Sequence, residues 1–210
     1  MKPDFQKTCI FRMTHINNLA SVMKYNILYS ANQYPSNDPF TPIHNEDVQD
    51  KRKKTIVPVA PGQVLWDYVP FYFGTHTPML YYNYINHHNQ DDIIYFVTTA
   101  QNVAHRGYQY AFTDGHAIQR ITAWYNDLKD LSKLDWESIY RRYWGPRQDS
   151  SGEYKRKKQS EFLVYRHLSW DVIRIIGVRT VETQKLVAGI MADFPAERQR
   201  RIVVKPVWYF

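Results

Sequence analysis

The chain has 210 residues, of which 44% are hydrophobic, so it can bury a core as one domain or as two small ones. Its one cysteine, Cys9, excludes an intramolecular disulfide framework and a cysteine-rich zinc site, and fits a reducing compartment. No window approaches the roughly 20 apolar residues of a membrane span, and the start of the chain has no apolar run typical of a secretory signal. We therefore expect a soluble, cytoplasmic protein that forms a single domain over 1–210 and has no membrane partner.

The net charge of +7 indicates a polyanionic partner. The excess is concentrated in "KRKK" at 51–54, "KRKK" at 155–158 and "RQRR" at 198–201, and aromatic residues make up 16% of the chain. Basic grooves with aromatic platforms hold single-stranded nucleic acid, because phosphates are neutralised while unpaired bases stack. Each run alone is equally consistent with a solvated loop, and most of the aromatic residues with core packing.

In chain order, a short amphipathic helix around 20–23 comes first, with Asn18 as a natural N-cap and Asn26 suited to the left-handed position after the helix. The polar stretch at 30–55 has no sustained hydrophobic periodicity and is too long for a loop that only connects two elements, which predicts a functional loop. Strand signals then dominate, separated by Pro, Gly, Asn and Asp turns, in the segments 55–60, 68–73, 79–85 and 92–99.

Helices and strands mix in the second half. Asp114-Gly115 is expected to open a helix that reaches Leu128, and another helix begins at Asp135. A polar loop at 145–160 leads into the strand "EFLVY", which starts at Glu161. Two more helices, around 171–175 and 180–191, precede a final strand at 201–210. Because strands and helices do not alternate regularly, the sequence favours an α+β fold over a doubly wound parallel sheet.

Several common sites are missing. The glycines form neither GxGxxG nor a P-loop, and no histidine pair has HExxH spacing, so we predict no metal site. Five features remain without an assigned role: "RMTHINN" at 12–18, Arg52, "DYVPFYF" with "TPMLYY", "FTDGHA" at 112–117 and "KKQSEFLVY". Each has an ordinary structural explanation: "DYVPFYF" suits an edge strand, because proline cannot donate to a ladder, and Asp114-Gly115 suits a turn.

The order of these motifs along the chain indicates a family, which the spacing of residues within each motif does not. "FRMTHINNLASVM", "DYVPFYF…TPMLYY", "FTDGHA", "DW…IYRRYW", "KQSEFLV" and the closing "VWYF" resemble the DarT family, bacterial toxins that ADP-ribosylate bases of single-stranded DNA. The resemblance runs from about Phe11 to Phe210. It implies an ADP-ribosyltransferase fold with a mixed, mostly antiparallel sheet and flanking helices. It also implies NAD as ADP-ribose donor, thymidine in single-stranded DNA as acceptor, and a cognate macrodomain antitoxin, DarG.

The resemblance also assigns residues. Glu161 matches the catalytic glutamate, and Arg52 matches an arginine that is both catalytic and in contact with NAD. Thr14, His15 and Asn17 match the NAD-binding segment. The chain departs from the pattern in three places, with His116 where asparagine is expected, His76-Thr77 where an Arg-Ser pair is expected, and Asn26 where glycine is usual.

The residues around Glu161 suggest how an acceptor could be held. Gln159 lies two residues earlier, so in an extended chain both side chains face the same way. This Q-x-E pattern resembles ADP-ribosyltransferases that modify amides or bases, in which the glutamine contacts the acceptor, although Gln159 could also be an ordinary strand residue. We expect His116, Lys157 and Lys158 on the acceptor side as well, with the two lysines keeping Glu161 ionised.

Two other functions stay open at this stage. A non-enzymatic module that binds single-stranded nucleic acid would explain the charge and the aromatic residues. An ADP-ribosyltransferase that acts on RNA, on protein or on another DNA base would keep the fold and NAD but change the acceptor.

Overall fold

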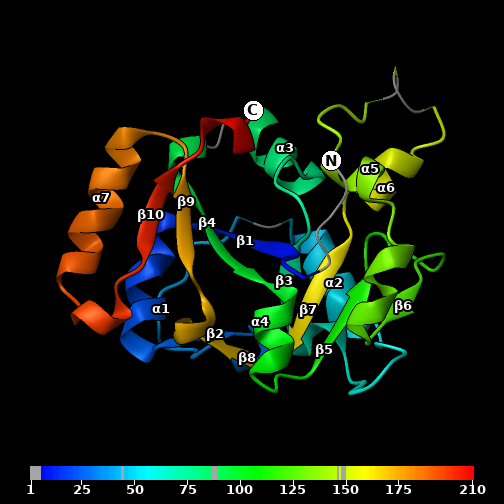
Figure 1. Ribbon diagram of the computed structural model, residues 1–210, viewed down its shortest axis with the longest axis horizontal. Coiled ribbons are helices and arrows are strands. Elements are labelled where there is room, and N and C mark those ends of the chain that lie inside the picture. Colours follow the sequence, from blue (N-terminus) through cyan, green and yellow to red (C-terminus); the bar gives the residue numbers. More distant parts are fainter. Residues whose placement is uncertain (1–5, 44, 87–88, 146, 148–149) are drawn as a thin grey trace.

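A computed structural model describes residues 6–43, 45–86, 89–145, 147 and 150–210. In this part of the chain an eight-stranded sheet has the order β10-β9-β4-β1-β3-β7-β5-β6 (Figure 1), and β2 pairs with β8 in a small second sheet. Neighbouring strands of the large sheet are antiparallel, except that β9 and β10 are parallel. The strands are β1 (Cys9–His15), β2 (Ile27–Tyr29), β3 (Tyr68–Tyr72), β4 (Ile93–Thr99), β5 (Tyr110–Thr113), β6 (Trp124–Tyr125), β7 (Glu161–Tyr165), β8 (His167–Ser169), β9 (Ile175–Val178) and β10 (Arg201–Val204).

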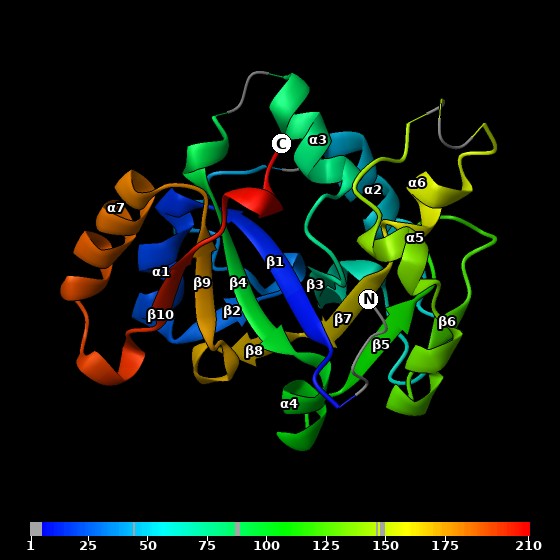
Figure 2. The same cartoon turned by 45° about the horizontal axis from the view of Figure 1, so that its top comes forward.

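Seven helices of the described ranges flank the large sheet. They are α1 (Leu19–Tyr25), α2 (Glu46–Lys54), α3 (Pro78–Ile85), α4 (Ala100–His105), α5 (Trp136–Tyr140), α6 (Glu153–Lys157) and α7 (Val181–Ala192). Figures 1 and 2 both place α1 and α7 at the β10 end, and α5 and α6 at the opposite end. None of the helices in the described ranges is long and apolar enough to cross a membrane.

The middle of the sheet is buried on both faces. In β4 every residue from Ile93 to Thr98 is buried, because alternate side chains enter two different hydrophobic clusters: Ile94 and Phe96 pack in one, and Tyr95 packs in the other. In β7 the first four residues, beginning with Glu161, are buried as well. The strand that carries Glu161 is therefore held on both sides.

The sheet opens between β1 and β3. These two strands share a single register pair, Phe11 with Tyr72, whereas β1 follows β4 along its whole length and β3 follows β7. Pro70 lies in the open part, and its carbonyl accepts a hydrogen bond of 3.2 Å from Arg12 Nη1. Since the N and C=O of one strand residue point to the same side, the missing N–H of Pro70 also faces this gap. The edge-strand prediction for β3 is therefore wrong, because the proline is accommodated inside the sheet by local separation of two strands.

Several predicted elements are present. Helix α1 is followed by Asn26, which has φ 56° in the left-handed region, and β3, β4 and β7 lie where the apolar runs predict them. Asp135 caps α5 by accepting from Ser138 N–H, and Thr180 caps α7 by accepting from Thr183 N–H. These elements have caps or apolar runs that a short window of sequence contains.

Other predictions are wrong. The tyrosine-rich stretch at 79–85 belongs to α3, because Thr77 caps it through Leu80 N–H and Pro78 occupies its first turn, and this outweighs strand propensity. The segment 55–60 forms only an isolated bridge, Ile56 with Val64. The expected helix from Asp114 is instead a turn followed by β6 and a 3-10 helix, Leu128–Lys133.

The two polar stretches predicted as loops each contain a helix. Helix α2 lies within 30–55: Asn45 caps it, Glu46 and Asp47 occupy its first turn, and four basic residues occupy its last turn, which suits the helix dipole. Helix α6 lies within 145–160. The predicted helix at 171–175 is only the 3-10 turn Trp170–Val172, and the predicted final strand ends at Val204, with Pro206 opening another 3-10 turn.

Candidate functional site

Glu161 is fixed at the start of β7 by hydrogen bonds on every side. Its side chain is 2% exposed, and Oε2 accepts from Arg52 Nη1 at 2.7 Å. Oε1 accepts from Ala117 N–H at 3.2 Å, and the Glu161 N–H donates to Thr113 Oγ1 at 3.0 Å. A carboxylate held in this way is already oriented before any substrate arrives, which is the condition for strong electrostatic stabilisation.

Arg52 is the cation that reaches this carboxylate. In the last turn of α2 it is buried, whereas Lys51, Lys53 and Lys54 are exposed. Its Nη1 is engaged by Glu161, and its Nη2 is buried without a hydrogen-bond partner among the described residues. A buried guanidinium N–H group without an acceptor is costly, and a ligand that offers an oxygen would relieve that cost.

Arg12 is a second arginine near the pair. Burial and then the charge of Arg52 lower its pKa to about 10. Arg12 has no role predicted from the sequence, although its spacing carries a signal: Arg12 and Thr14 lie two residues apart in a strand and so share a face.

The gap between β1 and β3 contains a cavity of about 290 Å³, here called the strand pocket. The charged and hydroxyl side chains in its wall include Arg12, Thr14, Arg52 and Glu161. Its aromatic lining consists of Tyr29, Tyr34, Phe40, Trp66, Tyr68 and Tyr72. The segment before α2 is tied over this pocket, because Asn18 exchanges side-chain hydrogen bonds of 2.8 and 2.9 Å with the backbone of Thr41.

A larger cavity of about 850 Å³ adjoins the strand pocket, and we call it the aromatic groove. Helices α2, α3 and α6, which stand around one end of the sheet in Figure 2, contribute to it. Its lining includes Lys51, Tyr81, Tyr82, Arg142, Tyr143, Trp144, Lys155, Gln159 and Phe210. Five residues line both cavities, so the groove and the strand pocket meet at Val48, Gln49, Tyr72, Met79 and His116.

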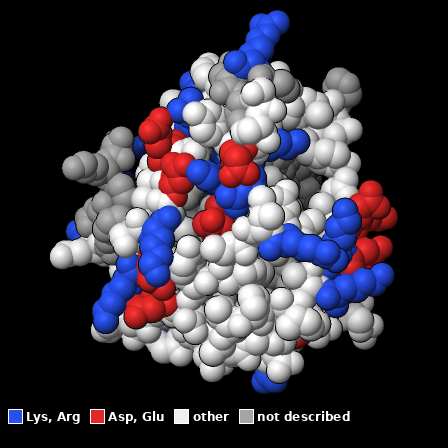
Figure 3. Space-filling view, turned by 90° about the vertical axis from the view of Figure 1, so that its right-hand side faces the viewer, with Lys and Arg blue, Asp and Glu red and all other residues white. Residues whose placement is uncertain are grey.

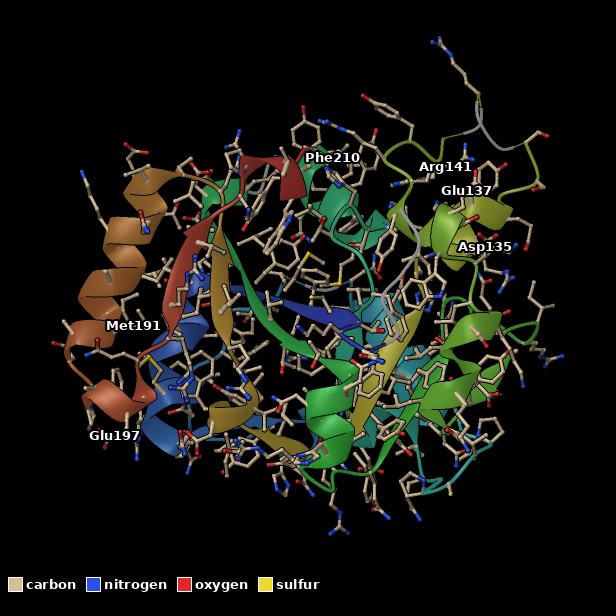
Figure 4. All side chains as sticks on the ribbon, viewed as in Figure 1. Asp135, Glu137, Arg141, Met191, Glu197 and Phe210 are labelled. Atoms are coloured by element: carbon tan, nitrogen blue, oxygen red, sulfur yellow. The ribbon has the colours of Figure 1, made fainter. Side chains whose placement is uncertain are left out.

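The far wall of the groove is fixed by the end of the chain. The backbone N–H of Phe210 donates to Gln90 Oε1 at 2.9 Å, and its ring lies edge-on to Tyr81 at 5.3 Å. His76, where the family pattern has arginine, lies 3.1 Å from the carbonyl of Tyr209 through Nε2 and packs edge-on against the Phe210 ring. Figure 4 shows Phe210 beside α3, apart from the labelled residues in and next to α5.

His116 stands where the two cavities meet. Its Nδ1 accepts from Ile118 N–H at 3.4 Å and lies 3.6 Å from Glu161 Oε1. Burial lowers its pKa, although the Glu161 carboxylate acts in the opposite direction. The ring is therefore neutral at pH 7, and an accepting Nδ1 leaves the proton on Nε2 as a donor.

Within the described ranges, no group of three His, Cys, Asp or Glu side chains is arranged to hold a metal ion.

Comparison with known proteins identifies the family. The family model "ssDNA thymidine ADP-ribosyltransferase, DarT" matches residues 11–210. A DNA ADP-ribosyl transferase of Thermus sp. (strain 2.9) is 35% identical over 209 residues, which is 98% of this chain and 97% of the relative. The chain belongs to the DarT family. One from Escherichia coli is 31% identical over 167 residues, 77% of this chain and 76% of that protein.

Solved structures agree with this membership. Thermus sp. 2.9 DarT in complex with ADP-ribosylated ssDNA has a TM-score of 0.92 at 34% identity, and the same DarT in complex with NAD+ has a TM-score of 0.88; both cover 100% of each chain. Thermosipho africanus DarTG, at 20% identity and a TM-score of 0.74, shares the fold. The predicted α+β, mostly antiparallel fold and the predicted single-stranded DNA thymidine ADP-ribosyltransferase family are confirmed.

The structure brings together part of the predicted DarT site. Glu161, Arg52, Thr14 and His116 all line the strand pocket. His15 and Asn17 lie just outside the pocket lining. His15 Nδ1 accepts from the Asn17 N–H at 3.2 Å, and the exposed Asn17 side chain donates to Thr41 Oγ1 at 3.4 Å.

The two predicted lysines lie elsewhere. Lys157 Nζ donates to Asp135 Oδ2, and Lys158 Nζ, which is buried, donates to the carbonyl of Ile139, both at 2.9 Å. Both ammonium groups therefore hold α5, and neither side chain lines the strand pocket. This corrects the expectation that the lysines keep Glu161 ionised, because the cation paired with the carboxylate is Arg52.

Gln159 faces the aromatic groove, but not for the reason predicted. It occupies the turn after α6, where its Nε2 donates to the carbonyl of Lys155 at 3.0 Å, so the alternation of an extended chain does not apply to it. Gln159 lines the groove and Glu161 lines the strand pocket. The two side chains therefore belong to neighbouring cavities.

The basic runs do not form one continuous surface. On the face shown in Figure 3, basic and acidic side chains lie next to one another; ion pairs on α5 and α6 include Arg141–Glu137 and Lys157–Asp135. Figure 4 shows Glu197, which precedes the 198–201 run, at the end of the molecule opposite Arg141. The groove takes one residue from each of the other two runs, Lys51 and Lys155.

Proposed function

We propose that this chain transfers ADP-ribose from NAD to thymine in single-stranded DNA, with Glu161 and Arg52 as its catalytic residues. One observation carries the assignment. A buried ion pair, Glu161 with Arg52, lies in a pocket that shares a wall with an open aromatic groove. This arrangement offers one site for a donor and an adjoining site for an acceptor.

The strand pocket fits NAD as the donor. Two guanidinium groups, those of Arg12 and Arg52, suit the charge of a pyrophosphate, and Arg52 Nη2 needs an acceptor. The aromatic walls suit flat rings, and Thr14 adds a hydroxyl. We assign His15 and Asn17 to the rim, where they hold the segment that follows Thr14 and can contact a ribose hydroxyl.

Glu161 would act on the charge that develops during the reaction. Loss of nicotinamide leaves positive charge on the ribose anomeric carbon, as in glycoside cleavage. The carboxylate, held by Arg52 and by Ala117 N–H, stabilises that charge without having to reorient. Preorganised groups of this kind contribute about 3–4 kcal/mol, which is roughly 10²–10³ in rate.

The aromatic groove would hold the DNA strand, with the target base where the two cavities meet. There the neutral His116 can donate from Nε2 to a base carbonyl, and Gln159 offers an amide to the acceptor. Arg52 by itself does not explain how the thymine base loses its proton, since a guanidinium is a poor base at neutral pH. We assign to Arg52 the stabilisation of negative charge on the base or on the pyrophosphate.

The family membership extends the proposal to a partner and a compartment. We assign the chain a macrodomain antitoxin of the DarG kind, and a place in the cytoplasm, where its DNA acceptor lies and where a lone cysteine stays reduced. We assign residues 1–210 to a single domain, which is supported by one large sheet that takes strands from both halves of the chain.

Mass spectrometry tests the proposal directly. The protein is incubated with NAD and with DNA oligonucleotides of varied sequence, and RNA oligonucleotides of the same sequences are matched competitors. We expect an added ADP-ribose on thymidine-containing DNA, released nicotinamide, and no product from Glu161→Ala, which should still bind NAD. Binding without nicotinamide release would support a non-enzymatic module, and modification of RNA in preference to DNA would reassign the acceptor.

A further inference from the structure

Arg156 belongs to the basic run at 155–158, yet it points into the protein. Its side chain is 9% exposed and lies between two carboxylates. Nη1 bonds to Asp114 Oδ1 at 3.2 Å, while Nε and Nη2 bond to Glu153 at 3.0 to 3.2 Å. A guanidinium whose N–H donors are engaged by two acidic side chains is not available to bind a DNA phosphate.

The turn that begins at Asp114 rests on this guanidinium. A Cβ at Gly115 would overlap Arg156 Nη1 and would lie 3.2 Å from Arg156 Cγ, so the backbone of Gly115 packs directly on the arginine. Asp114 Oδ1 also accepts from Ala123 N–H at 2.9 Å, which closes the other end of the turn. Arg156 therefore supports the turn by an ion pair and by direct packing.

The same turn holds the carboxylate of Glu161. Thr113 Oγ1 accepts from the Glu161 N–H at 3.0 Å and donates to the carbonyl of Gly115 at 2.6 Å, so one hydroxyl joins the turn to β7. Two residues further on, Ala117 N–H donates to Glu161 Oε1 at 3.2 Å. His116 lies between these two contacts.

We propose that Arg156 is a positioning residue that fixes the turn 114–117 and, through it, the Ala117 N–H and His116 against Glu161. The inference rests on the proposed catalytic role of Glu161. Arg156 touches neither cavity, whose linings do not include it. Its loss should therefore misplace the groups around the carboxylate and lower kcat, while KM for NAD and for the oligonucleotide change little.

The decisive experiment compares steady-state constants and melting temperatures of Arg156→Met, Arg156→Lys and Asp114→Asn. We expect Arg156→Met to lower kcat at least about tenfold, with both KM values within twofold of wild type. Arg156→Lys should recover part of the rate, because an ammonium keeps the charge but cannot reach both carboxylates in a fork. Asp114→Asn should lower kcat less than Arg156→Met does, since the amide oxygen can still accept from both Ala123 N–H and Arg156 Nη1 while the charge of the ion pair is lost.

Arg200→Met is the matched control. Arg200 has an 11% exposed side chain and an ion pair of 3.0 Å with Asp171, and it lies over Trp170. Its replacement should lower the melting temperature by a similar amount and leave kcat within twofold of wild type. A fall in kcat as large as that of Arg156→Met would mean that lost stability alone explains both, which overturns the inference.

Two further outcomes would contradict the positioning role of Arg156. Wild-type kcat in Arg156→Met would show that the turn needs no support from Arg156. A rise in KM for the oligonucleotide with unchanged kcat would make it a DNA-binding residue instead. Glu161→Ala is measured beside these variants. If Glu161→Ala keeps its activity, the proposed function is contradicted. If Glu161→Ala is inactive and Arg156→Met is fully active, only the positioning role of Arg156 is contradicted.

Discussion

Replacing Glu161 with glutamine keeps the shape of the side chain and removes its charge. In the native protein both carboxylate oxygens accept, Oε2 from Arg52 and Oε1 from Ala117 N–H. A glutamine amide can place its oxygen at only one of these positions, and its NH₂ group then faces a donor at the other. The variant therefore loses the charge and also one of the two hydrogen bonds.

The expected effects follow from these contacts. Loss of the preorganised charge should lower kcat by about 10²–10³, which corresponds to about 3–4 kcal/mol of transition-state stabilisation. Leaving the Arg52 guanidinium buried without its counter-charge should cost about 3–5 kcal/mol of folding stability. For a chain of this size that is a fall in melting temperature of roughly 6–20 °C.

The assay follows ADP-ribose addition to an oligonucleotide by mass spectrometry under single-turnover conditions, with calorimetry of NAD binding and thermal unfolding on the same preparation. NAD affinity should change by less than tenfold, because Arg12 and Thr14 remain in the strand pocket. A rate within tenfold of wild type would refute the role of the carboxylate. A melting temperature equal to that of wild type would refute the energetic importance of the buried pair.

Three further predictions concern Arg52, Lys158 and the aromatic groove. Arg52→Ala should lower the rate at pH 7 by about 10² or more, and recovery of the rate toward pH 9 would show that the arginine assists deprotonation of the base, whereas no recovery would assign it to the pyrophosphate. Burial lowers the pKa of Lys158 to about 8 from 10.5, so the unfolded chain binds more protons between these values and stability rises with pH across that window. The free energy of urea unfolding of wild type minus that of Lys158→Met should therefore increase by about 3 kcal/mol from pH 7 to 10.5, and a flat difference would show that the ammonium is not buried when charged. Tyr81→Ala and Trp144→Ala, whose rings lie 5.4 Å apart, should each weaken oligonucleotide binding by about 1–3 kcal/mol with NAD affinity unchanged, and an effect on NAD instead would move the DNA away from the groove.

Local signals in the sequence explain the elements that were predicted correctly. The apolar runs of β4 and β7 and the caps of α5 and α7 are contained in a few neighbouring residues, so no distant contact is needed to form them. The strand prediction for the α3 segment is wrong because tyrosines favour strands. The pair Thr77-Pro78 nevertheless carries a helix-start signal, an N-cap threonine followed by proline at the first helical position. Ordered short motifs identified the DarT family, because their order along the whole chain is far more specific than any one of them.

What the sequence determined by itself is the place of Glu161 at the start of a buried strand, and its family. The resemblance singled out Arg52, but the sequence could not determine that Arg52 pairs with this carboxylate, because the pair joins residues 109 positions apart. The tertiary structure decided this by burying one face of α2 against the gap between β1 and β3, so that Arg52 points inward while its lysine neighbours reach solvent. The fold likewise engages Arg156, Lys157 and Lys158 inside the protein or at its surface, since a cation in a basic run binds whichever carboxylate or carbonyl the fold brings within reach.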